Sequence, residues 1–151
     1  MNILVSHCLL GEPCRYDGVS RLDRQILELH RAGHNLIPVC PEVLGGLDVP
    51  RTPAERRPDG RVVDAQGKDV TTAFQVGAER ALEIARENGC TVAILKARSP
   101  SCGCGEIYDG TFTGTLTSGW GVTARLLLEA GISVMDEENL DSRLFFPDNR
   151  G

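Results

Sequence analysis

Features that would place this protein in a membrane or on nucleic acid are missing from its sequence. None of its apolar runs approaches the ~18 residues that cross a bilayer. Residues 1–6 carry no basic segment of the kind that begins an export signal. Lys and Arg total 16 against 21 Asp and Glu, which gives a net charge of -5, and the basic residues form no block. We therefore expect neither a membrane nor a nucleic acid as partner, and a cytoplasmic location.

The common cysteine motifs are also missing, although cysteine itself is abundant. The chain has 6 Cys but no Cys-x-x-Cys pair, and none of its 3 His stands at zinc-finger spacing. Without an export signal the compartment is expected to be reducing, where disulfides are rare. The surplus therefore indicates metal binding or thiol chemistry rather than cross-links.

The chain length and the apolar runs predict one α/β domain that spans residues 1–151. Of the 151 residues 41% are hydrophobic, enough for a domain that buries roughly 70% of the surface of its unfolded chain. Apolar runs of strand length alternate with segments of helical periodicity, which is typical of a parallel sheet. We expect three layers, a mostly parallel sheet with helices on both faces, as in Rossmann-like folds. The expected strands are 3–6, 36–39, 92–95 and 132–135, and the expected helices are 22–30, 71–89 and 122–130.

Two connecting segments have distinct compositions. Residues 45–60 are rich in Pro, Gly and charge, and we interpret them as a long functional loop. Residues 61–63 and 69–70 could form a small hairpin around Gln66-Gly67. Thr71 and Thr72 follow as candidate caps of the next helix.

Three cysteines stand at the ends of three expected strands: Cys8, Cys40 and Cys102. The carboxyl ends of parallel strands open on one edge of a sheet, so the three thiols could meet there. Thiolates select soft metals, namely zinc, copper(I) or iron–sulfur clusters, and three of them leave a coordination position open. Spacing alone does not decide between zinc and an iron–sulfur cluster.

Other candidate side chains lie next to these cysteines. Glu42 follows Cys40 by two residues and could act as a general base, or it could be a solvated surface residue. Ser99 and Ser101 could hydrogen-bond a substrate or cap a turn. Lys96 ends the third strand, and its charge is either functional or directed to solvent.

Seven blocks in order along the chain resemble the thiouracil desulfidase family, and the likeness runs from about residue 3 to residue 138. The blocks are Cys8-Leu9-Leu10-Gly11, Arg15-Tyr16-Asp17-Gly18, Cys40-Pro41-Glu42, Gly45-Gly46-Leu47 with Pro50-Arg51, Asp69-Val70-Thr71, Leu95-Lys96 with Ser99-Pro100-Ser101-Cys102-Gly103, and Ile107-Tyr108-Asp109-Gly110.

The resemblance implies a [4Fe-4S] cluster held by Cys8, Cys40 and Cys102, with a fourth iron that is free of protein and takes the substrate sulfur. It implies that Glu42 is the acidic catalytic residue and that a serine takes part, Ser101 first and Ser99 second. Zinc is the alternative metal.

The implied reaction removes sulfur from a thiocarbonyl, as in 2-thiouracil, and gives the carbonyl and hydrogen sulfide without net electron transfer. The implied partner is a small thiolated base or nucleoside, bound by a monomer or a homodimer. Tyr16, Asp17, Lys96 and Tyr108 are the candidates for holding a planar ring.

Two other functions fit the same residues. A sulfur-transfer or redox enzyme would use Cys102 with Cys104, or Cys8, as a sulfur carrier and would work without iron. A zinc-binding or iron–sulfur-binding sensor would bind metal tightly and turn nothing over.

Overall fold

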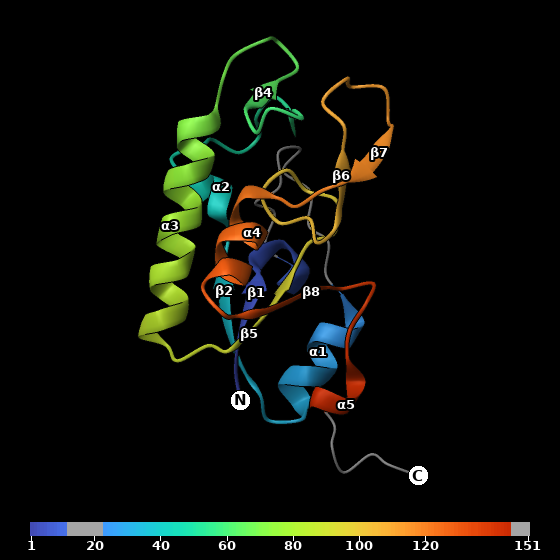
Figure 1. Ribbon diagram of the computed structural model, residues 1–151. Coiled ribbons are helices and arrows are strands. Elements are labelled where there is room, and N and C mark those ends of the chain that lie inside the picture. The colour runs from blue at the N-terminus through green and yellow to red at the C-terminus, as the bar shows by residue number, and fades with distance from the viewer. Residues whose placement is uncertain (12–22, 146–151) are drawn as a thin grey trace.

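A four-stranded parallel sheet forms the centre of the protein in a computed structural model, which describes residues 1–11 and 23–145 (Figure 1). The strands run in the order β2-β1-β5-β8, and every neighbouring pair is parallel. All four predicted strands are present, each within one residue of its expected bounds. They are β1 (Asn2–Ser6), β2 (Asn35–Val39), β5 (Val92–Leu95) and β8 (Ser133–Asp136).

Helices cover both faces of this sheet, which confirms the predicted three layers (Figure 1). On one face lie α3 (Thr71–Glu87) and α4 (Val122–Glu129), and on the other lie α1 (Arg24–Arg31) and α5 (Ser142–Phe145). Successive strand residues point to opposite faces, so both sides of each central strand are apolar. The first core contains Leu4, Ala93 and Leu95 with Leu82 and Leu127, and the second contains Ile3, Val5 and Ile94 with Ile26, Leu29 and Phe145.

The helix ends show which boundary signals in the sequence were reliable. Asp23 caps α1, because its carboxylate accepts from the backbone N–H groups of Gln25 and Ile26 at 2.9 and 3.3 Å. Gly33 follows α1 with φ +95°, the left-handed conformation that favours glycine after a helix. The predicted capping role of Thr71 is wrong. Its hydroxyl instead accepts from Val62 N–H at 2.9 Å and ties α3 to the preceding segment.

Two small antiparallel ribbons lie beyond the carboxyl edge of the sheet, at the end opposite the N-terminus (Figure 1). One pairs β3 (Ala54–Arg56) with β4 (Val62–Asp64), and the other pairs β6 (Glu106–Tyr108) with β7 (Leu116–Ser118). The prediction that 45–60 is all loop is therefore wrong. The hairpin predicted for 61–70 exists only as a tight turn with an isolated bridge between Val63 and Asp69, because β4 takes β3 as its main partner.

Two glycines set a very close contact between α2 (Pro41–Leu44) and α3. A Cβ atom on Gly77 would lie 1.8 Å from the Pro41 carbonyl oxygen, and one on Gly45 would lie 1.9 Å from the Ala73 carbonyl oxygen. Only glycine permits backbones to approach in this way. The contact fixes α2, and with it the residues on either side of Pro41, at the carboxyl edge of β2.

Candidate active site

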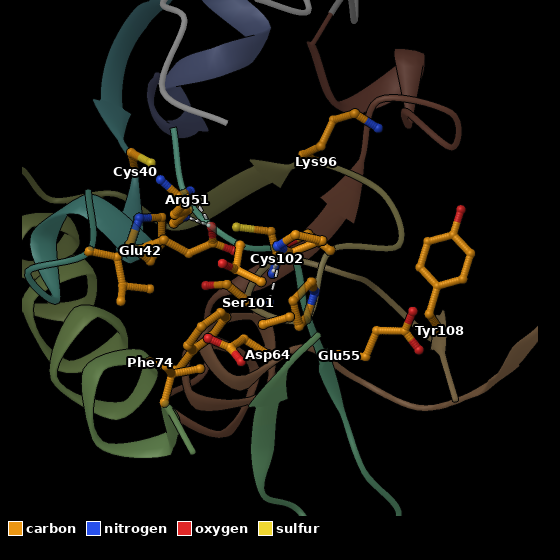
Figure 2. A pocket seen from close by; sticks show the side chains of 18 of the residues that line it. Cys40, Glu42, Arg51, Glu55, Asp64, Phe74, Lys96, Ser101, Cys102 and Tyr108 are labelled. Carbon is orange, nitrogen blue, oxygen red and sulfur yellow. Dashed lines mark hydrogen bonds and ion pairs between the residues drawn. The ribbon is translucent and has the colours of Figure 1, made fainter. Parts of the chain in front are cut away.

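A cavity of about 720 Å³ opens at the carboxyl edge of the sheet, between the strand ends and the two ribbons. It lies where β1 is flanked by β2 on one side and β5 on the other. From β1 the chain continues to β2 on one side, and from β5 it continues to β8 on the other side. Open α/β sheets bind ligands at such a point, where the connections diverge. Figure 2 shows Cys40, Glu42 and Arg51 on one side of this cavity, with Cys102 and Ser101 at its centre and Glu55 and Tyr108 on the other side.

The three cysteines predicted to converge all line this cavity. Cys8 lies in the 3-10 helix η1 (His7–Leu10) directly after β1, Cys40 precedes α2 directly after β2, and Cys102 lies in the loop after β5. Cys8 and Cys102 are buried and Cys40 is half-buried. His7 lines the same cavity.

The chemistry of the three thiols fits an iron–sulfur cluster. Among residues 1–11 and 23–145, no group of three His, Cys, Asp or Glu side chains could hold one metal ion. Thiolates hold iron–sulfur clusters, and they also select zinc and copper(I). Three soft thiols around one cavity supply a donor set of this kind.

Burial controls the ionisation of Cys102. Its pKa is raised to about 12, chiefly by desolvation, while hydrogen bonds from Ser6 and Ser101 act to lower it. The negative charges of Glu42 and Cys40 raise the pKa further. A bound metal would offset these charges and deprotonate the thiol.

Glu42 faces the cavity as the second residue of α2, and its side chain is 16% exposed. Arg51, 10% exposed, holds it in an ion pair: Nε donates to Oε2 at 2.9 Å, and Nη2 contacts the same oxygen. Nη1 of Arg51 donates to the Asp48 carbonyl oxygen at 2.8 Å. Sequence reasoning gave Arg51 no role, although it stands in one of the blocks that carry the family resemblance.

Ser99 and Ser101 line the cavity with different hydrogen-bonding roles. The hydroxyl of Ser99 accepts from the backbone N–H groups of Ser101 and Cys102 at 3.1 and 3.0 Å, so it caps the turn that carries them. Ser101 is 1% exposed, and its hydroxyl lies 2.8 Å from that of Thr123 in α4. The first N–H groups of α4 bind the Pro100 and Ser101 carbonyl oxygens, which fixes this loop against the helix.

Of the four residues predicted to hold a planar ring, two lie in the described part of the chain. Lys96 lines the cavity, but its Nζ forms an ion pair with Glu137 at 2.9 Å, and its N–H donates to the Ser6 hydroxyl at 2.9 Å. Tyr108 lines the cavity from β6 and is 37% exposed. Tyr16 and Asp17, together with Cys14, lie outside the described residues.

The remaining described cysteines do not line the cavity. Cys90 is a buried member of the core between the sheet and α3. Cys104 follows Cys102 by two residues, and its thiol donates to the Cys102 carbonyl oxygen at 3.4 Å. Burial raises the pKa of both Cys90 and Cys104.

Side chains from the two ribbons complete the lining, and sequence reasoning missed most of them. Glu55 of β3 and Phe112 of the β6–β7 turn both face the cavity. Neither lies in an apolar run or a recognisable motif, so no local signal pointed to them.

No helix in the described part of the chain is both long and apolar enough to cross a membrane.

Comparison with known proteins identifies the family of this chain. Residues 3–139 match the model of the family described as 2-thiouracil desulfurase. A solved structure described as the [4Fe-4S]-dependent thiouracil desulfidase TudS superposes with a TM-score of 0.86 at 46% identity, over 92% of each chain. The uncharacterized protein YbbK of Bacillus subtilis strain 168 is 42% identical over 94% of this chain and 99% of its own length. The family resemblance carried by the seven sequence blocks is therefore confirmed, and this chain belongs to the 2-thiouracil desulfurase family of enzymes.

Proposed function

We propose that this protein is a [4Fe-4S]-dependent desulfidase that converts the thiocarbonyl of a thiobase such as 2-thiouracil into a carbonyl and releases hydrogen sulfide. The observation that carries the proposal is the meeting of Cys8, Cys40 and Cys102 around one cavity that also holds the Glu42 carboxylate. The activity described for the TudS relative supports it.

The donor set supports the proposed cofactor. Cys8, Cys40 and Cys102 would hold the cluster, which when bound would supply one iron without a protein ligand as a soft Lewis acid for the thiocarbonyl sulfur. Three thiols cannot close the coordination of four irons, so the donor count agrees with one open position.

Glu42 is proposed as the general base. Its carboxylate takes a proton from a water whose oxygen bonds to the thiocarbonyl carbon. Arg51 orients this carboxylate, and Nε and Nη2 both contact its Oε2 rather than its Oε1. The carbon–sulfur bond breaks as the carbonyl forms, and the sulfur departs with the two protons of the water. The reaction is a hydrolysis that needs no oxidant or reductant.

Ser101 and the ring-binding residues are proposed to orient the substrate. The Ser101 hydroxyl can accept from Thr123 and donate to the substrate, since a hydroxyl does both. Tyr108 offers a stacking surface, and Lys96 lines the same cavity. Tyr16 and Asp17 remain proposed ring-binding residues, and Ser99 a secondary one.

The two alternative functions receive less support. A sulfur carrier built from Cys102 and Cys104 needs a reactive thiolate, but burial raises the pKa of both thiols, and Cys104 does not line the cavity. A metal-binding sensor has no need of a carboxylate held by an arginine beside the thiols.

The test uses protein prepared and assayed without oxygen. We expect iron and acid-labile sulfide in the wild type, and sulfide release from 2-thiouracil with oxygen from labelled water in the product. E42Q should retain the iron but lose activity by about 10²–10⁴-fold, the usual contribution of general acid–base catalysis. The matched control E28Q changes an exposed glutamate of α1 and should be fully active. Zinc in place of iron, or full activity of E42Q, would overturn the proposal.

We further propose that the protein works in the cytoplasm, as a monomer or homodimer, on a small thiolated base or nucleoside. Reduced thiols and an iron–sulfur cluster are suited to a reducing compartment. Light scattering gives the oligomeric state, cell fractionation the location, and a panel of thiobases and thionucleosides the substrate.

A further inference from the structure

We propose that Glu55 is a positioning residue for substrate binding: it fixes the turn of the β6–β7 ribbon so that Tyr108 and Phe112 form an aromatic wall for the ring of the substrate. The inference rests on the proposed thiobase substrate.

The contact between Glu55 and the turn is specific. Glu55 stands in the middle of β3, opposite Val63 of β4, and its Oε1 accepts from the N–H groups of Gly110 and Phe112 at 3.0 and 3.2 Å. A single carboxylate oxygen thus holds two amides of the turn, and hydrogen bonds to a charged acceptor are stronger than neutral ones. The ribbon that carries Glu55 is in turn fixed to α3 through Thr71 and Val62.

The backbone of the turn needs this acceptor. Gly110 has φ +95° and Phe112 has φ +57°, so two left-handed residues surround Thr111. This alternation makes neighbouring amides converge, which forms a small anion-binding concavity that the Glu55 carboxylate fills. A phenylalanine rarely adopts a positive φ, and such a conformation persists only where the surroundings impose it.

The turn also lies directly on the β3 ribbon. A Cβ on Gly110 would approach the Arg57 Cα to 3.2 Å and the Arg56 carbonyl oxygen to 3.3 Å. Within the turn, Asp109 accepts from the N–H and the hydroxyl of Thr111 at 3.0 and 2.6 Å. The turn is thus ordered internally by Asp109, while Glu55 fixes its position relative to the cavity.

The β6–β7 ribbon and its turn present two aromatic side chains to the cavity, which suit a planar ring. Tyr108 is 37% and Phe112 38% exposed, and both line the cavity. Large aromatic side chains left open at a cavity have a surface to offer to a flat ligand, with which they stack or make edge contacts. Figure 2 shows Glu55 beside Tyr108, on the side of the cavity away from Cys40 and Glu42. The ring would therefore lie between the aromatic wall and the thiols.

The test compares E55A and E55Q with the wild type, using E106A as the matched control. Glu106 lies in β6, on the ribbon that carries the turn; it is exposed, and it pairs with Arg98 at 3.4 Å rather than with the turn. Hydrogen exchange of residues 108–116 reports on the turn without any substrate. We expect faster exchange in E55A, with an intermediate rate in E55Q, because its neutral amide oxygen is a weaker acceptor. E106A should match the wild type.

Kinetics with 2-thiouracil separate positioning from chemistry. We expect E55A to raise KM on the order of tenfold, because the substrate ring loses its contact with a fixed aromatic wall. The value of kcat should stay within about twofold of the wild type. F112A should raise KM similarly without accelerating exchange at Gly110. A fall in kcat at unchanged KM would overturn the inference, as would unchanged exchange in E55A. If E55A does not fold, E55Q decides, since unchanged exchange in E55Q overturns it. Absence of activity in the wild type would refute the proposed function, while the exchange result would still test the turn.

Discussion

Gly77 of α3 and Pro41 of α2 are in direct backbone contact, so close that a Cβ on Gly77 would lie 1.8 Å from the Pro41 carbonyl oxygen. Pro41 stands between Cys40 and Glu42, a proposed cluster ligand and the proposed general base. A contact on the far side of α2 therefore determines where two groups of the cavity lie.

We expect G77A to lower both stability and iron content. Alanine is favoured over glycine in a helix by roughly 1 kcal/mol, so any loss of stability in G77A must come from the contact with α2. Forcing a methyl group into a packed contact costs about 1–3 kcal/mol, and it would push α2 away from β2. Urea unfolding and iron per chain measure the effect. V76A, at an exposed neighbour on α3, is the control. A fully loaded, equally stable G77A would contradict the expectation.

Arg51 should affect turnover rather than cluster binding. Its guanidinium holds the Glu42 carboxylate, and misplacing a catalytic group by about 1 Å can cost 10²-fold in rate. We expect R51A to lose kcat by about 10–100-fold with its iron retained. R51K should recover part of the rate, because lysine keeps the charge but not the planar fork. R61A, which removes an exposed arginine, serves as control. Loss of iron in R51A would indicate a role in cluster binding instead.

The hydroxyl pair of Ser101 and Thr123 should contribute to stability. Both side chains are buried, and their oxygens lie 2.8 Å apart. T123V keeps the shape of the side chain but leaves the Ser101 hydroxyl without this partner, which should cost about 1–3 kcal/mol in urea unfolding. Adding S101A to T123V should restore part of the loss, since both polar groups are then gone. A T123V protein as stable as the wild type would show that the pair contributes nothing.

The cluster-free protein should lose stability as the pH rises above about 9. Burial raises the pKa of the Cys102 thiol from 9.0 to about 12 in the folded protein. Between these values the unfolded chain releases a proton that the folded chain keeps, so alkali favours unfolding. Cys90 and Cys104, whose pKa values burial also raises, should add to this slope. Urea midpoints against pH measure it. C102A should give a shallower slope, and an identical slope would contradict the assignment.

The sequence predicted the sheet and the place of the site because both depend on strong local signals. Continuous apolar runs identified β1, β2, β5 and β8, and the geometry of parallel strands then implied that Cys8, Cys40 and Cys102 end at one edge. The blocks of the resemblance pointed to Glu42 and to the serines of the loop after β5.

The remaining parts depend on contacts that leave no local pattern. Helix α2 has four residues, too few to show a helical period, and it is fixed by the distant Gly77. Strand β3 has three residues without an apolar run, and it exists because β4 pairs with it. Glu55 lies on this strand, so the sequence did not predict its role. The role of Arg51 depends on its contact with Glu42, which only the three-dimensional structure shows.

The order β2-β1-β5 has a practical consequence for how the proposed cluster would be assembled. The three cysteines follow adjacent strands whose backbones are already joined by a ladder of hydrogen bonds, with two apolar cores behind them. The sheet thus fixes the backbone positions of the three cysteines before any cluster binds. A chelator should therefore strip the iron and leave a folded chain, ready for refilling, whereas zinc fingers unfold when their ion is removed.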